Sequence, residues 1–245
     1  GDRSSLRLRD VDVEAILAAA AANPRTVVVV QSGSAVVATE WVDAVPAVVQ
    51  AWYGGCRAGP GLADVLTGAV NPSARLPFSV PADEADLPPF DRDATTSLYD
   101  RWHGWWHLRR TGVTPPFPFG FGLSYTTFEL AGDVEAHLDA DHHAIRVRAA
   151  VRNTGARDGA DVVQVYAELA DPDAPARLVG FARVEVAAGA ESPVDVVVPL
   201  DRLARRDPAA HAWVQPSGPH RIVVARHAAD SAAVTAVVDV GSLPV

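Results

Sequence analysis

One short segment of the chain gathers aromatic and imidazole side chains that could meet a ligand. Trp102, His103, Trp105 and Trp106 lie within five residues of one another. An indole ring suits the apolar face of a pyranose, and its N–H can meet a hydroxyl group, so this segment is a candidate sugar-stacking surface. The same composition is equally typical of a hydrophobic cluster packed beneath a long loop. Residue types alone leave both interpretations open.

Two histidines near these tryptophans have a spacing that metal sites use. His103 and His107 would share one face if this segment were helical, and such a pair supplies half of many zinc sites. No Glu stands between them at the required place, and no third ligand is evident. Packing or sugar contact is therefore favoured, and the sequence implies neither a metal nor an organic cofactor.

Acidic residues form two clusters ahead of the tryptophans, namely Asp83, Glu84 and Asp86, then Asp91 and Asp93. Paired carboxylates carry out glycoside hydrolysis. Catalytic acids are usually desolvated so that their pKa values shift, whereas both clusters lie among prolines in a polar stretch. The sequence favours a solvated loop.

A glycine-rich stretch, residues 54–61, offers backbone N–H groups that an anion could bind. It matches neither the Walker pattern nor G-x-G-x-x-G, and Pro60 removes one donor. A tight turn before a helix is the favoured interpretation. Cys56 has no base at a suggestive spacing, so it is predicted to be a small packing residue.

Composition narrows the class of protein. The 245 residues carry a formal net charge of −9, which argues against a nucleic-acid partner. No apolar run approaches the roughly 18 residues of a membrane span, so no membrane partner is expected. Residues 1–5 carry no signal-peptide pattern, and the compartment, cytoplasmic or secreted, stays open.

The elements that must position the candidate residues begin as a mixture of helices and strands. Residues 10–22 predict a helix, because acids lead and alanines follow. Residues 26–30 are apolar without alternation, which predicts a strand buried on both faces. Residues 48–53 predict a second strand, and residues 59–67 predict a short helix. This alternation predicts an α/β fold with a mostly parallel sheet and helices.

The later part of the chain has a different pattern. Residues 145–152 and 163–169 alternate apolar and polar side chains, which predicts strands with one solvated face. Further strands are predicted over residues 178–186, 194–200, 220–225 and 234–240. Several short strands separated by turn signals predict a β-sandwich of immunoglobulin or fibronectin type III shape.

Sequence motifs add a family resemblance to this pattern. Residues 31–36 read QSGSAV, residues 51–68 run from AWYGG to ADVLTG, residues 71–77 read NPSARLP and residues 117–128 read FPFGFGLSYTTF. These segments resemble SGSPV, AWYPGQEGGxAxADVLxG, NPSGRLP and the very specific FPFGxGLSYTxF of glycoside hydrolase family 3, the β-glucosidase family. Residues 151–189 resemble the fibronectin type III-like domain of that family.

The resemblance implies a domain order. A (β/α)8 barrel with the nucleophile Asp comes first, an α/β sandwich that supplies the acid/base Glu follows, and the fibronectin-like domain comes last. Residues 1–125 would be the C-terminal portion of the α/β sandwich, with a Pro- and aromatic-rich segment at 81–125. Residues 126–245 would be the fibronectin type III-like domain, so the implied fold is α/β followed by all-β.

The resemblance also implies a function. The chain would be part of a retaining, exo-acting β-glycosidase that hydrolyses terminal sugars from β-glycosides. Gly1-Asp2-Arg3 is similar to a segment that follows the acid/base Glu in many members, so both catalytic carboxylates are expected upstream of Gly1 and none within this chain. The chain alone is then expected to be inactive, because it needs an upstream barrel in the same or a separate chain.

Asp2 and Arg3 are thereby expected near the active site, and Trp102 and His103 are expected to contact a β-glycoside. The family segment YxEGxxVGYR is replaced here by YDRWHGWW at residues 99–106. The common Glu is absent and larger aromatic residues are present, so a different sugar preference is expected.

Two other functions stay open. A non-catalytic carbohydrate-binding or scaffolding protein derived from such an enzyme would carry the same motifs without a barrel. A fibronectin-type adhesion module would leave residues 1–125 unexplained.

Overall fold

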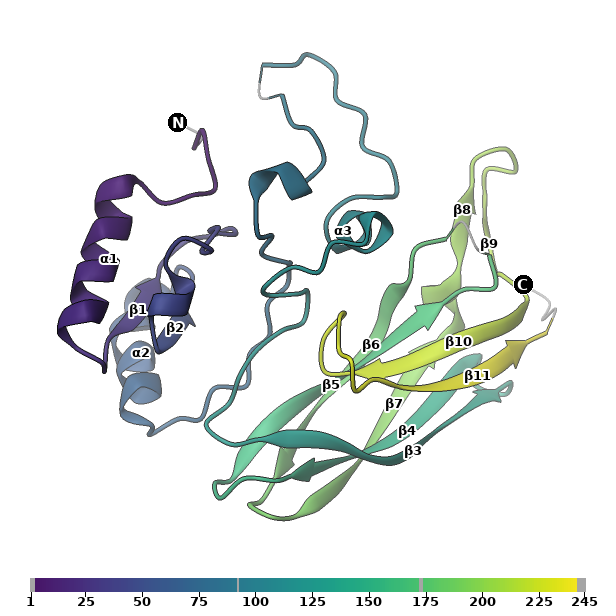
Figure 1. The fold of residues 1–245 in the computed structure, drawn as a ribbon. Helices are drawn as coiled ribbons and strands as arrows, with labels where there is room; N and C mark the ends of the chain where they lie inside the picture. Colours follow the sequence, from purple (N-terminus) through teal and green to yellow (C-terminus); the bar gives the residue numbers. More distant parts are fainter. Residues whose placement is uncertain (1–2, 92, 172–173, 242–245) are drawn as a thin grey trace. The chain divides into compact units, whose positions relative to one another are not determined.

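The computed structural model describes residues 3–91, 93–171 and 174–241 (Figure 1). The chain divides into two compact units. The first unit comprises Gly1–Val70 and Pro77–Phe119, and the second comprises Asn71–Leu76 and Gly120–Val245. The short segment Asn71–Leu76 therefore packs with the later part of the chain, not with its sequence neighbours.

The first unit mixes helices with a small parallel sheet. Its elements are α1 (Asp10–Ala22), β1 (Val27–Val30), η1 (Val42–Ala44), β2 (Ala47–Gln50), η2 (Gly55–Arg57), α2 (Ala58–Thr67), η3 (Glu84–Asp86) and α3 (Trp105–Thr111). β1 pairs in parallel with β2, from Val27 opposite Ala47 to Val30 opposite Gln50. This confirms the predicted α/β fold with a parallel sheet.

Local sequence explains three boundaries of the two predicted helices. Asp10 and Asp12 lie in the first turn of α1, where a negative charge complements the helix dipole. Asn23 adopts an extended conformation and ends the helix. α2 ends at Gly68, whose φ of 77° lies in the left-handed region that glycine enters at no steric cost. The sequence signals at these ends are local, which is why they could be read directly.

The core of the first unit is small and lies on one side of the sheet. Trp41 is buried there with Ala38 and Val45. The side chains packed against them come from α1, β1 and the adjoining segments: Leu8, Val13, Ile16, Ala20, Val28, Val30 and Val42. Alternate valines of β1 thus meet the helix.

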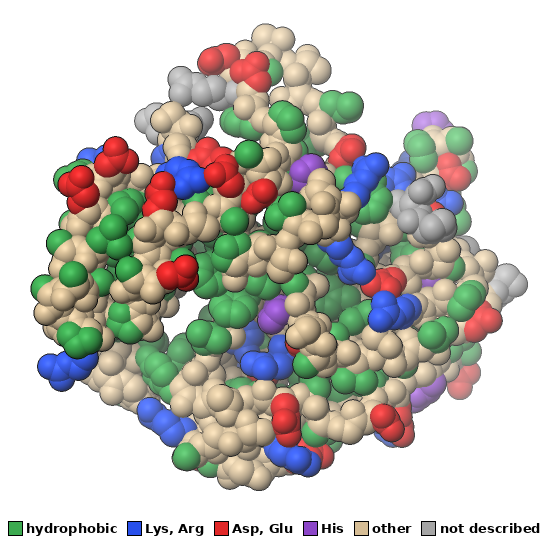
Figure 2. Space-filling view, in the orientation of Figure 1, with side chains coloured by type: hydrophobic (Ala, Val, Ile, Leu, Met, Phe, Trp, Pro, Cys, Tyr) green, Lys and Arg blue, Asp and Glu red, His purple; other side chains and the backbone are tan. Residues whose placement is uncertain are grey.

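The prediction that β1 is buried on both faces is wrong. Val27 and Val29 are 41% and 36% exposed, and Val48 of β2 is 38% exposed. A parallel sheet needs a second layer to cover its other face, and no described element buries these valines. Figure 2 shows hydrophobic side chains reaching the surface of the chain.

The second unit is a β-sandwich. Its long strands are β3 (Phe128–Asp139), β4 (Ala144–Asn153), β5 (Gly159–Glu168), β6 (Arg177–Val186), β7 (Glu191–Pro199), β10 (Gly218–Ala225) and β11 (Val234–Val240). They form antiparallel sheets in the orders β3-β4-β7 and β11-β10-β5-β6. Side chains such as Ile145, Val165 and Ile222 fill the core between the sheets. This confirms the predicted β-sandwich.

Two features of this unit escaped prediction. β3 is interrupted by a register shift between Ala131 and Glu135, next to Gly132, whose φ is 68°. The irregularity breaks the apolar alternation that would have marked a strand. β8 (Arg205–Asp207) and β9 (Ala212–Val214) form a separate short hairpin.

A buried carboxylate joins three parts of the second unit. The side chain of Asp161, on β5, is fully buried. It accepts a hydrogen bond from the guanidinium of Arg75 and a second, 3.0 Å long, from Nε of Arg226. The Arg75 side chain is only 9% exposed. This ion pair fixes the segment Asn71–Leu76 against the sandwich.

We predict that Asp161→Asn strongly destabilises the second unit. Two guanidinium groups would then share a neutral, weaker acceptor, and breaking a buried ion pair costs about 3 kcal/mol or more. Asp195→Asn is the matched control, because Asp195 pairs with Arg148 on an exposed strand face, where a pair is worth under about 1 kcal/mol. Urea unfolding followed by circular dichroism gives both values, and equal losses would contradict the prediction.

We also predict that the exposed valines of β1 make the isolated chain self-associate, since an apolar face beside an unpaired strand edge favours association. The double variant Val27→Thr, Val29→Thr should shift sedimentation toward the monomer. Val70→Thr, a similarly exposed valine outside any strand, should not. A double variant that sediments like the unchanged chain would contradict this.

Candidate functional site

The carboxyl ends of β1 and β2 form the first part of the candidate site. Ligands of parallel sheets commonly bind beyond this edge. After β1 the chain turns through Ser32, Gly33 and Ser34, and this turn is internally bonded. Gln50 Nε2 donates to the Ser32 carbonyl oxygen at 3.0 Å, and Ser32 Oγ donates to the Ser34 carbonyl oxygen at 2.8 Å. The turn is therefore fixed by the neighbouring strand.

Arg3 lies at this same edge. Its guanidinium donates hydrogen bonds to Ser34 Oγ and, at 3.2 Å, to the Ala35 carbonyl oxygen. Arg3 is thus attached to the turn that follows β1, although it was singled out only by family resemblance. Asp2, the other residue expected here, lies outside the described residues.

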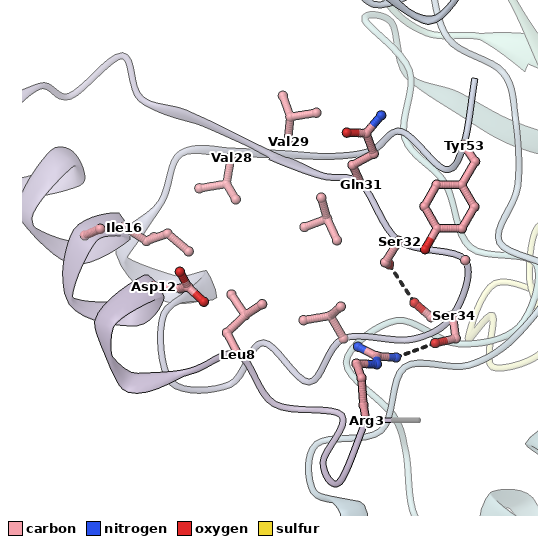
Figure 3. A pocket seen from close by; sticks show the side chains of 14 residues that line it. Arg3, Leu8, Asp12, Ile16, Val28, Val29, Gln31, Ser32, Ser34 and Tyr53 are labelled. Atoms are coloured by element: carbon pink, nitrogen blue, oxygen red, sulfur yellow. Dashed lines mark hydrogen bonds between the residues drawn. The ribbon is translucent and has the colours of Figure 1, made fainter. Parts of the chain in front are cut away.

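A groove of about 800 Å³ runs from this edge along β1 toward α1. Figure 3 shows Ile16 of α1, Val28 of β1 and Leu8 facing a common space, with Arg3, Ser34 and Gln31 toward the other end. The end near α1 is therefore mainly apolar but also carries the Asp12 carboxylate, which pairs with Arg9, whereas the other end carries a cation, hydroxyls and an amide.

The segment leading from Arg3 into α1 is held from a distance. Glu84, in η3, accepts three hydrogen bonds on one carboxylate oxygen, from Ser5 Oγ, from Leu6 N at 2.6 Å and from Arg7 N at 3.3 Å. The hydrogen bond from Ser5, followed by those from the two backbone N–H groups, holds the pKa of Glu84 below its usual range against the opposing effect of desolvation. Glu84 is therefore a structural anion at neutral pH.

The first acidic cluster lies in a solvent-accessible turn, as the sequence favours, but its side chains are engaged in specific contacts there. Asp83 and Asp86 form a capping box at η3, in which each side chain accepts from the backbone of the turn. Asp83 also pairs with Arg7 at 2.6 Å. These acids shape a turn and hold a distant segment, an outcome that local sequence patterns do not reveal. In the second cluster, Asp91 accepts from the Asp93 backbone N–H at 2.9 Å.

The aromatic segment forms the second part of the candidate site. The His103 ring lies edge-on to Tyr99 and Trp106, with centroids 5.6 and 5.5 Å apart. Trp105 stacks on Phe119 at 5.6 Å. The segment thus packs on itself, as one of the two interpretations predicted, and still leaves His103 exposed.

Trp102 lies beside this cluster with one ring face covered. The guanidinium carbon of Arg110 is 4.8 Å from its ring centroid, a cation–π distance. The ring is half-buried. Trp106 Nε1 is buried and has no hydrogen-bond partner among the described residues. The segment therefore offers a preformed aromatic surface at Trp102 and His103, whereas the Trp106 indole N–H is enclosed.

The helical spacing considered for His103 and His107 is not realised. α3 begins at Trp105, after Gly104 with a φ of 58°, so only His107 is helical. His103 Nδ1 lies 2.7 Å from the Asp100 carbonyl oxygen. Within the parts of the chain that the structure describes, no group of three or more His, Cys, Asp or Glu side chains could hold a metal ion, and no helix is long and apolar enough to cross a membrane.

The loop after β2 contains a residue that sequence reasoning missed. Trp52 has a φ of 54°, which is uncommon for a bulky side chain and marks local strain. Its ring meets Phe78 edge-on at 5.3 Å. Tyr53, the next residue, lines the groove beside Gly33, where an added Cβ would come within 2.8 Å of the Tyr53 ring. No local sequence signal distinguishes this strained Trp from an ordinary strand residue.

Comparison with known proteins finds a family match in each of the two parts of the chain. Residues 1–125 match the Glycosyl hydrolase family 3 C-terminal domain, and residues 161–228 match the Fibronectin type III-like domain. Beta-glucosidase B of Emericella nidulans is 39% identical over 246 residues, which cover 92% of this chain and 28% of the relative. Probable beta-glucosidase J of Aspergillus fumigatus is 37% identical over 89% of this chain and 27% of its own length.

Solved structures agree with these matches. The beta-D-glucoside glucohydrolase of Trichoderma reesei has a TM-score of 0.88 at 26% identity, over 97% of this chain and 37% of that one. DesR, a beta-glucosidase from Streptomyces venezuelae solved in complex with D-glucose, has a TM-score of 0.87 at 32% identity, over 98% of this chain and 32% of that one. The chain thus spans less than a third of the curated relatives' length. It belongs to glycosyl hydrolase family 3 and carries the family's C-terminal domain followed by a fibronectin type III-like domain.

Proposed function

We propose that this chain is the C-terminal part of a retaining, exo-acting β-glycosidase that removes terminal sugars from β-glycosides. The observation that carries the proposal is the match of 92% of the chain to a β-glucosidase of which it covers only 28%. Under this proposal an upstream (β/α)8 barrel, in the same or a separate chain, supplies the nucleophile Asp. The acid/base Glu also precedes Gly1.

The chemistry of such an enzyme needs two free carboxyl groups. The nucleophile attacks the anomeric carbon while the acid protonates the departing glycosidic oxygen, and water then releases the sugar from the enzyme with its configuration retained. Asp83 and Glu84 are engaged with Arg7 and with the backbone of residues 6 and 7. In this proposal these two acids hold the entering segment, and the upstream part performs the bond cleavage.

The described residues take two roles in this proposal. Arg3 fixes the entering segment at the carboxyl end of β1, next to the groove. Trp102 and His103 contact the aglycone of the bound β-glycoside, since an indole ring packs well on sugar and aryl rings. The half-buried Trp102 ring, held by Arg110, is already ordered for that contact.

The proposal is tested by comparing the chain alone with a joined enzyme, in which a (β/α)8 barrel and the rest of the α/β sandwich precede Gly1. The joined enzyme should hydrolyse p-nitrophenyl β-glucoside and release β-glucose first, as proton NMR can show. The chain alone should give no turnover above buffer. A joined enzyme that melts cooperatively yet has no turnover would contradict the proposal and favour the non-catalytic carbohydrate-binding alternative.

A second prediction concerns Trp102. In the joined enzyme, Trp102→Ala should raise KM for aryl β-glucosides roughly threefold to tenfold, because an aromatic contact contributes about 0.5–1.5 kcal/mol. Trp213→Ala is the matched control, since Trp213 is 66% exposed on β9 in the other unit, and its KM should not change. Steady-state kinetics give both values, and an unchanged KM for Trp102→Ala removes this residue from the binding site.

A further inference from the structure

We propose that Glu84 is a positioning residue, whose carboxylate fixes residues 5–7 and thereby places Arg3 and the chain that enters the site. The inference rests on the proposed function, because it concerns the segment through which the catalytic part would connect. Glu84 touches no reacting group under this proposal. It acts through the backbone that it holds.

The contact set is unusual because three donors converge on one oxygen atom. Ser5 Oγ and Leu6 N donate to Glu84 Oε1, and Arg7 N shares its hydrogen bond between Glu84 Oε1 at 3.3 Å and Ser5 Oγ at 3.0 Å. Hydrogen bonds to an ionised acceptor are roughly twice as strong as neutral ones. The partners lie 77 to 79 residues away in sequence, so this clamp closes a long loop of chain onto the entering segment.

Two further contacts extend the clamp to the segment that follows β1. Val37 N donates to the Leu6 carbonyl oxygen at 3.0 Å, and Arg7 pairs with Val37 in a parallel bridge. Arg3 is only two residues before Ser5, a reach of about 7 Å when extended, and it contacts Ser34 and Ala35. A displacement of residues 5–7 would therefore also displace Arg3 from its contacts with Ser34 and Ala35.

The 3₁₀ turn η3 fixes the position of the Glu84 carboxylate. Glu84 is the first residue of η3, between Asp83 and Asp86 of the capping box. Asp83 and Glu40 bind the Arg7 guanidinium at 2.6 and 2.9 Å, so they hold its side chain, whereas Glu84 holds the backbone. The structure thus separates a side-chain anchor from a backbone anchor.

The first arm of the test uses the chain as it is. Hydrogen exchange should show that Glu84→Ala speeds the exchange of the Leu6 amide roughly tenfold or more. The Arg7 amide should change less, because it also donates to Ser5 Oγ at 3.0 Å. Glu84→Gln should lie between, because its amide oxygen still accepts. Glu14→Gln, an exposed acid on α1, is the control and should not change them. Unchanged exchange in Glu84→Ala would overturn the clamp, and if that variant fails to fold, Glu84→Gln decides.

The second arm uses the joined enzyme and a readout that simple loss of structure would not move. If Glu84 fixes residues 5–7 and thereby helps to place the proposed upstream acid/base Glu, Glu84→Gln should lower kcat with little change in KM. The loss should be several times larger for p-nitrophenyl than for 2,4-dinitrophenyl β-glucoside, whose better leaving group needs less protonation. Equal losses for both substrates would overturn the positioning role.

The two arms distinguish a failure of the proposed function from a failure of the positioning role of Glu84. If the unmodified joined enzyme is folded and inactive, the proposed function fails, and with it the catalytic consequence of Glu84. The exchange arm would still decide whether Glu84 fixes residues 5–7. If the joined enzyme is active and Glu84→Gln leaves kcat unchanged, the positioning role fails and the proposed function stands.

Discussion

The parallel pairing of β1 with β2 is the interaction on which the first unit depends. Four residues of each strand pair in register, and the two strands end side by side at the carboxyl end of the ladder. Because the strands run in the same direction, the turn at Ser32–Ser34 and the strained loop at Trp52 emerge at one edge. Arg3 attaches to that edge, so the short ladder determines where the polar groups of the candidate site gather.

Only one face of this two-stranded sheet is covered by other elements that the structure describes. Val28 and Val30 meet the apolar face of α1, while Val27 and Val29 stay partly exposed. Long-range polar contacts compensate for the small core, above all the hydrogen bonds of Glu84 to residues 5–7. In the second unit apolar packing dominates over polar contacts. Two sheets enclose an apolar core, and the Asp161 ion pair is added to it.

Sequence reasoning succeeded where the signals are local. The alanine run of α1, Gly68 after α2 and the alternation of β4 each encode their own structure. The family resemblance rests on contiguous motifs and is confirmed by the matches to both domains.

It failed where the outcome depends on residues far apart in the chain. Nothing near Glu84 shows that its partners are residues 5–7, and nothing near Asp161 reveals Arg75 and Arg226. Gly104 ends the helical spacing of His103 and His107 by a backbone conformation that composition does not specify. The exposed face of β1 depends on what lies beside the strand, which its own valines cannot encode.

The pairing of Leu76 with the chain around Gly120 has a consequence for how this protein can change over time. Leu76 N donates to the Phe121 carbonyl oxygen and Gly120 N to the Leu76 carbonyl oxygen, both at 2.8 Å. The two ends of the segment formed by residues 77–119 are therefore held together by these hydrogen bonds. We call this segment, which lies between the bonded ends, a cassette. The entropy of closing a loop grows only slowly with its length. Insertions and deletions inside this cassette, which carries the aromatic residues, can therefore accumulate during evolution without a change of register in the strands outside it.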